Sequence, residues 1–219
     1  MLVYMEFGAL TMVAIMANVL GAAMALPQTR KLLSTRSVEG VSITWAAASA
    51  TVNACWIAYG LGVDDLGIVP VSVVSVIAYI VIGVGIYRFS PTSGRHVVVP
   101  AIVTGVVVMT VPLIALLVGG WVAAGLALGV LYGVQLLPAV VTVYRTVDVS
   151  GVSLATWVIA VVEAVLWGFY GLANVDAGLI ALAVTGTMMS SLVLARLLLR
   201  RSRRASHDEP LGLPGLVTA

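Results

Sequence analysis

Two predicted helices each carry a tryptophan near one end and a polar side chain close by. Glu163 and Trp167 are four residues apart in the apolar run 152–172, so a helix places them on one face, one turn apart. A carboxylate at mid-membrane costs about 2.5–3.5 kcal/mol on insertion scales, and such groups usually face a cavity or a partner. Glu163 therefore binds a substrate, carries a proton, or is a protonated structural carboxyl bonded to a neighbouring helix.

The apolar run 43–62 carries a comparable set. Trp56, Asn53 and Ser49 share one helix face at spacings of three and four residues. An indole ring offers an apolar surface to the C–H faces of a sugar, while amide and hydroxyl groups bind its polar edges. The alternatives are a membrane-surface aromatic belt for Trp56 and Trp167 and helix–helix bonding for Asn53.

A third helix, 67–87, presents Ser72, Ser75 and Tyr79 along one stripe. Ser72 and Ser75 are further candidates for substrate binding, with close helix packing as the alternative for Ser75. The remaining tryptophans lie near predicted helix starts and are expected in the aromatic belt: Trp45, Trp121 and Trp157.

Other chemistry is not supported by the sequence. Cys55 is the only cysteine, His96 and His207 lie in a loop and a tail, and no metalloprotease or phosphate-loop signature is present. The only lysine, Lys31, is in a loop, which excludes a retinal protein. We expect no enzyme activity, no metal and no cofactor.

Composition places these helices in a membrane. Of 219 residues, 61% are hydrophobic and 9% are charged, against roughly 25% charge in soluble domains. A soluble enzyme, a nucleic-acid binder and a disulfide scaffold are thereby excluded. Seven runs have about the length that a membrane-spanning helix needs: 7–26, 43–62, 67–87, 97–118, 121–143, 152–172 and 177–199.

The charges agree with seven spans. Every Lys and Arg falls after the first, third or fifth span, at the end of the seventh, or in the tail. The opposite side carries the acidic residues Glu6, Asp64, Asp65 and Asp176. Because cytoplasmic loops are enriched in Lys and Arg, we expect a cell-membrane protein with its N-terminus outside and its C-terminus in the cytoplasm.

The sequence repeats itself at a shift of 111 residues. The aligned positions are Leu26-Pro27 with Leu137-Pro138, Gly40-Val41-Ser42 with Gly151-Val152-Ser153, Trp56 with Trp167, Tyr59-Gly60-Leu61 with Tyr170-Gly171-Leu172, and Asp65 with Asp176. We therefore expect two parallel three-helix repeats, 1–90 and 119–200, joined by a linker helix, 91–118, and followed by a cytoplasmic tail, 201–219. Transporters built from such repeats bind substrate near the midplane.

Two prolines occupy equivalent places in the repeats. Pro27 and Pro138 fall at the predicted cytoplasmic ends of the first and fifth spans, where proline bends or ends a helix. They are either hinges of an inner gate, together with Gln28, or ordinary helix ends. On the fifth span Gly125, Gly129 and Gly133 permit close packing, and Gln135 either lines a cavity or packs.

These residues resemble the PQ-loop superfamily and, within it, the SWEET sugar transporters. The first copy carries the similar order Leu26-Pro27-Gln28, Lys31, Ser37-Val38-Glu39-Gly40-Val41-Ser42 and Trp56-Ile57-Ala58-Tyr59-Gly60. The resemblance implies a three-plus-one-plus-three helix fold in which Trp56 and Trp167 flank a sugar. Where such proteins carry an asparagine on the third helix of each unit, this chain has Ser72 and Ala183.

Three functions follow as hypotheses. The first is passive transport of a small sugar or polyol by alternating access through a central pocket. The second is a proton-coupled amino-acid carrier that uses Glu163, and the third is a membrane receptor or chaperone without transport. The expected partners are a small-molecule substrate and the lipid bilayer, with no nucleic acid. A homo-oligomer is possible but not required, because one chain holds both repeats and needs no second subunit for a pore.

Overall fold

The structure is a computed structural model that describes residues 2–36, 38, 42–90, 94–145 and 152–207. Over these residues the regular structure is entirely helical. The six helical elements are α1 (Leu2–Thr35), α2 (Ile43–Gly62), α3 (Val69–Phe89), α4 (Arg95–Arg145), α5 (Leu154–Ala173) and α6 (Ala177–His207).

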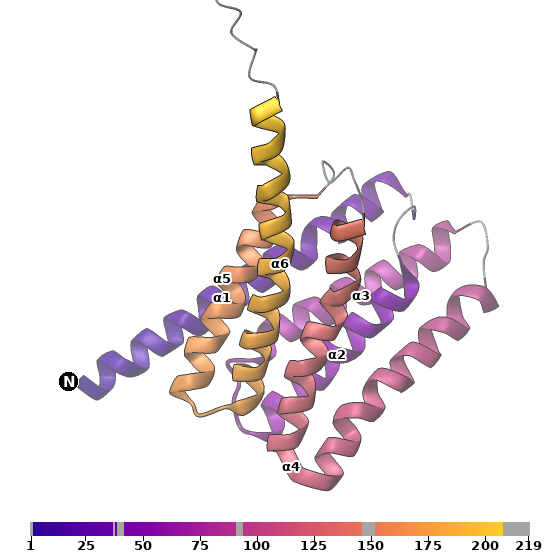
Figure 1. The fold of residues 1–219 in the computed structure, drawn as a ribbon. Coiled ribbons are helices and arrows are strands. Elements are labelled where there is room, and N and C mark those ends of the chain that lie inside the picture. Colours follow the sequence, from indigo (N-terminus) through magenta and orange to yellow (C-terminus); the bar gives the residue numbers. More distant parts are fainter. Residues whose placement is uncertain (1, 37, 39–41, 91–93, 146–151, 208–219) are drawn as a thin grey trace, which may run out of the picture.

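Helix α4 is two helices joined at a sharp break. Its 51 residues would extend about 75 Å as one rod, well beyond the roughly 30 Å of a bilayer core. At Gly119 (φ −133°, ψ 17°) and Gly120 (φ 66°, ψ −160°) the backbone leaves the helical region, and the chain turns back at the bottom of Figure 1. The first segment (95–118) and the second segment (121–145) bring the helices to seven, which confirms the expected all-α, seven-helix fold.

Length and composition agree with membrane crossing. Within the part of the chain that the structure describes, four helices are long and apolar enough to cross: Val69–Phe89, His96–Arg145, Leu154–Ala173 and Ala177–Arg200, with Gly8–Met24 a shorter apolar helix. The broken His96–Arg145 helix supplies two of the seven expected spans. Ser49, Thr51 and Asn53 lie together in the middle of α2, and such polar groups lower the hydropathy of a span.

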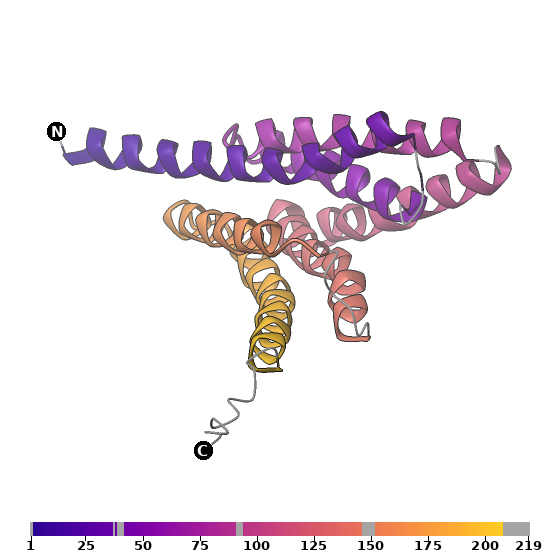
Figure 2. The same ribbon diagram turned by 90° about the horizontal axis from the view of Figure 1, so that it is seen from above.

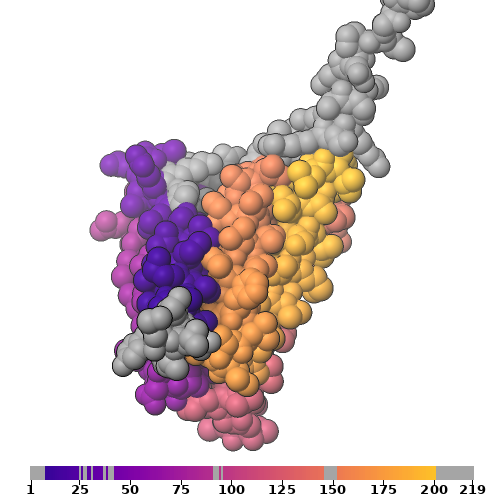
Figure 3. All heavy atoms as spheres, turned by 90° about the vertical axis from the view of Figure 1, so that its left-hand side faces the viewer, coloured from indigo at the N-terminus to yellow at the C-terminus, as the bar shows by residue number. Residues whose placement is uncertain are grey.

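The helices pack in the same order in both repeats. In the first repeat α3 lies between α1 and α2, and in the second α6 lies between α4 and α5. Contacts of α1 with α5 and of α2 with α4 close a ring, and Figure 2 shows α1 running alongside α5. On the face drawn in Figure 3, α5 lies between α1 and α6.

Local geometry repeats as well. Ser42 and Ser153, which are 111 residues apart, each accept a hydrogen bond at the start of α2 and of α5, the usual role of an N-cap serine. After these helices the chain turns through Asp64 and Val175, both with positive φ (57° and 55°). The next residue in each case, Asp65 or Asp176, donates its N–H across the turn over 2.8 Å.

The two ends of the molecule differ in charge. The turns after α2 and α5 and the break in α4 lie at one end, which we call the Asp end after Asp64, Asp65 and Asp176. The C-terminal parts of α1, α3, α4 and α6 lie at the other, the Arg end, with these described arginines: Arg30, Arg36, Arg88, Arg145, Arg196 and Arg200.

Several helices are longer than the sequence suggests. The α1 helix continues through position 27 to Thr35, and α4 continues through Pro138 to Arg145. Neither proline ends its helix. The expected tail begins inside α6, which extends to His207, and residues 208–219 lie outside the described residues.

Candidate functional site

A cavity of about 230 Å³ lies between the two repeats, and every helix α1 to α6 contributes to its wall. Pockets for drug-sized ligands hold roughly 300–1,000 Å³, so this cavity suits a smaller solute. Much of the lining consists of positions that are equivalent in the two repeats. Eight pairs 111 residues apart line it: Gly21 and Tyr132, Met24 and Gln135, Trp45 and Thr156, Ser49 and Ala160, Val52 and Glu163, Trp56 and Trp167, Ile68 and Leu179, Val71 and Leu182.

The seven residues predicted to bind substrate all lie in this lining. They are Ser49, Asn53, Trp56, Ser72, Ser75, Glu163 and Trp167. The structure therefore brings together, from α2, α3 and α5, side chains that the sequence connects only by their helix faces. Their role in binding stays a prediction.

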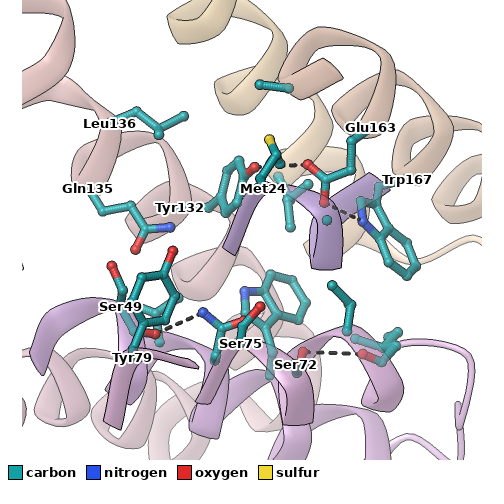
Figure 4. A pocket seen from close by; sticks show the side chains of 18 of the residues that line it. Met24, Ser49, Ser72, Ser75, Tyr79, Tyr132, Gln135, Leu136, Glu163 and Trp167 are labelled. Carbon is teal, nitrogen blue, oxygen red and sulfur yellow. Dashed lines mark hydrogen bonds between the residues drawn. The ribbon is translucent and has the colours of Figure 1, made fainter. Parts of the chain in front are cut away.

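Glu163 is buried, with 5% of its surface exposed. Its carboxyl group accepts a hydrogen bond from the Tyr132 hydroxyl over 3.1 Å and another from the Trp167 indole N–H over 3.0 Å. Figure 4 shows this arrangement, with Tyr132 between Gln135 and Glu163. Gly21 leaves room for it, because a Cβ there would lie 3.1 Å from Oε1 of Glu163.

The two equivalent tryptophans differ in their partners. The Trp167 N–H is held by Glu163, whereas the buried Trp56 Nε1 has no hydrogen-bond partner among the described residues. Oε1 of Gln135, also in the cavity lining, is likewise buried without a described partner. Buried polar atoms are nearly always bonded, so this donor and this acceptor are exceptions, each carried by a side chain that lines the cavity.

The walls formed by α3 and α6 differ in polarity. The α3 wall presents Ser72, Ser75 and Tyr79, whereas α6 presents Leu179 and Leu182. The Ser72 hydroxyl donates to its own helix backbone at Ile68 over 3.2 Å, and the Asn53 amide donates to the backbone of Ser49 over 2.8 Å.

The Asp end is closed by a reciprocal pair of hydrogen bonds. The Tyr59 hydroxyl bonds the Asp176 carboxylate, at 2.9 Å from each oxygen. The Tyr170 hydroxyl donates to Oδ1 of Asp65 over 2.8 Å. Since Tyr59 and Tyr170 are equivalent, as are Asp65 and Asp176, each repeat ties its tyrosine to the other's aspartate.

An apolar core lies beneath these bonds. Its buried members are Ala17, Val52, Trp56, Tyr59, Ile68, Leu128, Trp167, Leu179 and Leu182. Trp56 meets Tyr59 edge to face with ring centroids 5.4 Å apart, and Trp167 meets Tyr170 at 5.8 Å. The tryptophans that line the cavity thus rest on the tyrosines that close it.

Towards the Arg end the cavity extends to residues that solvent reaches. Trp45, which is 37% exposed, Thr156 and Trp157 line it near the starts of α2 and α5. Trp45 and Trp157 thus line the cavity, and their place in the aromatic belt stays a prediction. Trp121 instead packs on Tyr59, with ring centroids 6.3 Å apart.

Of the three proposed gate residues, the structure describes the side chain of Pro138 alone. Pro138 is exposed on α4 and does not line the cavity, and the side chains of Pro27 and Gln28 lie outside the described residues. Asn18 serves packing, because it bonds the backbone of Gly67 and of Val71.

The glycines of the second α4 segment pack as predicted. A Cβ at Gly125 would lie 2.7 Å from the ring of Tyr59, and one at Gly129 would lie 2.6 Å from the backbone of α6. At Gly133 it would lie 2.6 Å from Thr185. These three positions therefore hold α4 close to α2 and α6.

Sequence reasoning missed Tyr132 and the closing pairs. The sequence places Tyr59 and Tyr170 as repeat matches, and Asp65 and Asp176 as repeat matches on the acidic side, but it does not pair them with each other. The sequence did contain a signal for the closing pairs. A polar side chain at equivalent positions of both repeats, next to the end of an apolar helix, indicates a contact between the two repeats. Tyr132 carries no such signal, since its equivalent is Gly21.

The described helices form two three-helix sets with the same packing order, and the cavity between them is lined by equivalent positions of both. Residues 8–93 match the model of the family described as "Sugar efflux transporter for intercellular exchange". The solved structure of a eukaryotic SWEET transporter has the same fold, with a TM-score of 0.69 and 14% sequence identity over 89% of this chain and 99% of that chain. No curated protein matches the chain. The resemblance to SWEET transporters is confirmed.

Proposed function

We propose that this chain is a passive carrier of a small sugar or related polyol, which it moves by alternating access through the cavity between its repeats. The observation that carries the proposal is the position of that cavity. It is lined by equivalent residues of both repeats, is closed at the Asp end by reciprocal bonds, and extends to exposed residues towards the Arg end. Both matches are to transporters and neither is to an enzyme.

The lining offers what a sugar requires. The indoles of Trp56 and Trp167 supply apolar surface for the C–H faces of a ring. The unpartnered N–H of Trp56 can donate to a hydroxyl, and the Glu163 carboxyl and the Gln135 carbonyl oxygen can accept from others. Small-molecule sites typically have a mostly apolar wall with a small number of polar groups at defined positions.

Alternating access requires an Asp end that can open. The bonds of Tyr59 with Asp176 and of Tyr170 with Asp65 join the two repeats, so a relative movement of the repeats breaks both together. We propose that the structure represents the state open to the Arg end, and that this end faces the cytoplasm, because Lys and Arg are enriched in cytoplasmic loops. Pro27, Gln28 and Pro138 are proposed to bend at this mouth.

The test is hexose counterflow in liposomes that contain the purified protein. We expect labelled hexose to enter against preloaded unlabelled hexose, and Trp167→Ala to lower the rate by about tenfold or more, since 1.4 kcal/mol of lost contact suffices. Trp121→Phe is the matched control, because Trp121 is outside the cavity lining. Absence of hexose movement in both the native protein and the control contradicts the proposal.

The amino-acid carrier is less well supported. An amino acid brings a carboxylate of its own, and the described residues that line the cavity include no Lys, Arg or His to bind it. Glu163 would lie close to that carboxylate without an intervening positive charge. The pH dependence of uptake in Glu163→Gln and native protein measures any proton coupling directly.

A further inference from the structure

The cavity holds a carboxyl group with no described positive charge beside it. Glu163 is 5% exposed, and none of the described lining residues is Lys, Arg or His. Both of its hydrogen bonds are donated to it, by an O–H and an N–H, an arrangement that an ionised carboxylate can accept. A carboxylate offers about four lone-pair sites, so acceptor capacity remains for a ligand.

Aromatic rings surround the same space. Those in the lining are Trp45, Trp56, Tyr79, Tyr132, Trp157 and Trp167. The faces of such rings attract cations, and this attraction is strongest where water is excluded. Gln135 adds a buried carbonyl oxygen without a described partner. A carboxylate, a free acceptor and several rings together form a set that suits an ammonium group.

The residues at the Asp end carry negative charge, the same sign as an ionised Glu163. No Lys or Arg occurs within 37–87, 96–144 or 146–195, whereas Asp64, Asp65 and Asp176 lie at this end. An acidic entrance raises the local concentration of cations. In the state open to the Asp end, this charge favours entry of the same class of solute.

The geometry points to a small hydroxylated amine, such as an amino sugar carried as its ammonium ion, as the preferred substrate class, with Glu163 as its counter-ion. This inference rests on the proposed carrier function and narrows its substrate. The ring of an amino sugar keeps the C–H faces that suit Trp56 and Trp167, and its ammonium group supplies the positive charge that the cavity lacks. A neutral sugar offers Glu163 hydrogen bonds but no counter-ion, whereas an ammonium group pairs with the carboxylate.

The test is competition in the counterflow assay with labelled glucose. The competitors are glucose, glucosamine, and N-acetylglucosamine, in which the amine is a neutral amide. Because hydrogen bonds to charged groups contribute about 1.5–3 kcal/mol and 1.4 kcal/mol is tenfold in affinity, we expect glucosamine to compete about tenfold better than glucose. In Glu163→Gln this preference falls to about twofold or less, while Trp121→Phe, a change outside the cavity lining, leaves the preference intact.

A second readout is electrical. An inside-negative membrane potential should concentrate glucosamine in native proteoliposomes and leave the glucose level at equilibrium. Glucosamine competing no better than glucose, or an undiminished preference in folded Glu163→Gln, overturns the inference and leaves the carrier function standing. Failure of every solute to move overturns both. If Glu163→Gln does not fold, the native competition ratio and the potential dependence still decide.

Discussion

The same residue type performs two different tasks at positions 56 and 167. Trp167 is fixed, because Glu163 accepts its N–H over 3.0 Å. Trp56 packs on Tyr59 in the same way as Trp167 packs on Tyr170, but its N–H has no partner among the described residues. Equivalent rings therefore provide equivalent surface, while hydrogen bonding distinguishes the two sides of the cavity.

Trp56→Phe tests the free N–H. The ring surface is largely kept and the donor is lost, so apparent hexose affinity should fall by the value of one hydrogen bond, about 0.5–1.5 kcal/mol, or up to about tenfold. The measurement is the half-saturating hexose concentration in counterflow. An unchanged value would mean that the Trp56 N–H does not bind substrate.

Tyr132→Phe tests the other donor to Glu163. The phenyl ring stays in the wall and one of the two bonds to the carboxyl group is lost. We expect a lower unfolding temperature, because a hydrogen bond to a charged group contributes about 1.5–3 kcal/mol to stability. The check is the unfolding temperature of the purified protein, and an unchanged temperature would show that this bond contributes nothing to the fold.

Among the elements, the turns after α2 and α5 matter most, because they present Asp65 and Asp176 to the opposite repeat. Each aspartate also accepts a backbone N–H of its own turn, from Gly67 and Leu179 respectively, over 2.9 Å. The carboxylate is thus held rigidly where the tyrosine of the other repeat reaches it.

Tyr59→Phe removes one of the closing bonds and Tyr170→Phe the other. Each loss should raise the ratio of the state open at the Asp end to the closed state by about tenfold or more. The reason is that a hydrogen bond to a charged group contributes about 1.5–3 kcal/mol. The measurement is the rate at which a cysteine at position 72, in a Cys55→Ala background, reacts with an impermeant reagent added at the Asp end. Equal rates with and without the two tyrosine hydroxyls would contradict the closing role.

The break in α4 depends on glycine. Gly120 adopts φ 66° and ψ −160°, a region essentially restricted to glycine, where other residues cost about 1–3 kcal/mol. Gly120→Ala should lower the unfolding temperature by roughly 2–4 °C per kcal/mol. Gly83→Ala is the control, because a Cβ there meets only Ile43 at 3.8 Å, and it should leave the temperature equal or higher.

How much the sequence predicts depends on the kind of contact. Faces along one helix follow from spacing, which is why Glu163 with Trp167 and Trp56 with Asn53 were paired correctly as neighbours in one wall. Contacts between helices, such as that of Tyr132 with Glu163, depend on packing that no local pattern encodes. Helix ends were misjudged at Pro27 and Pro138 because neighbouring helices support a backbone that proline alone would interrupt.

For the whole molecule, two packed repeats and a linker helix explain both the cavity and the distribution of charge. The sequence repeat at 111 residues predicted the halves, and the equal packing order of their helices follows from it. The first segment of α4 runs once more between the two ends of the molecule, so both repeats start from the same end. Every described basic residue therefore lies at the Arg end.

Orientation in the membrane is tested by labelling in intact cells. In a Cys55→Ala background, a cysteine at Leu66, which is 68% exposed at the Asp end, should react with an impermeant maleimide from outside. A cysteine at Arg145, at the Arg end, should react only after permeabilisation. The reverse pattern would contradict the proposed orientation, in which positive charge lies on the cytoplasmic side.

The central claim is that one cavity between the repeats is reached from both sides in turn. The most direct test is a single cysteine at position 75, a buried site in the cavity lining, in the Cys55→Ala protein reconstituted with known orientation. We predict that an impermeant thiol reagent reacts from either side and that saturating substrate slows both reactions. Reaction from one side alone, whatever solute is present, would contradict transport by alternating access.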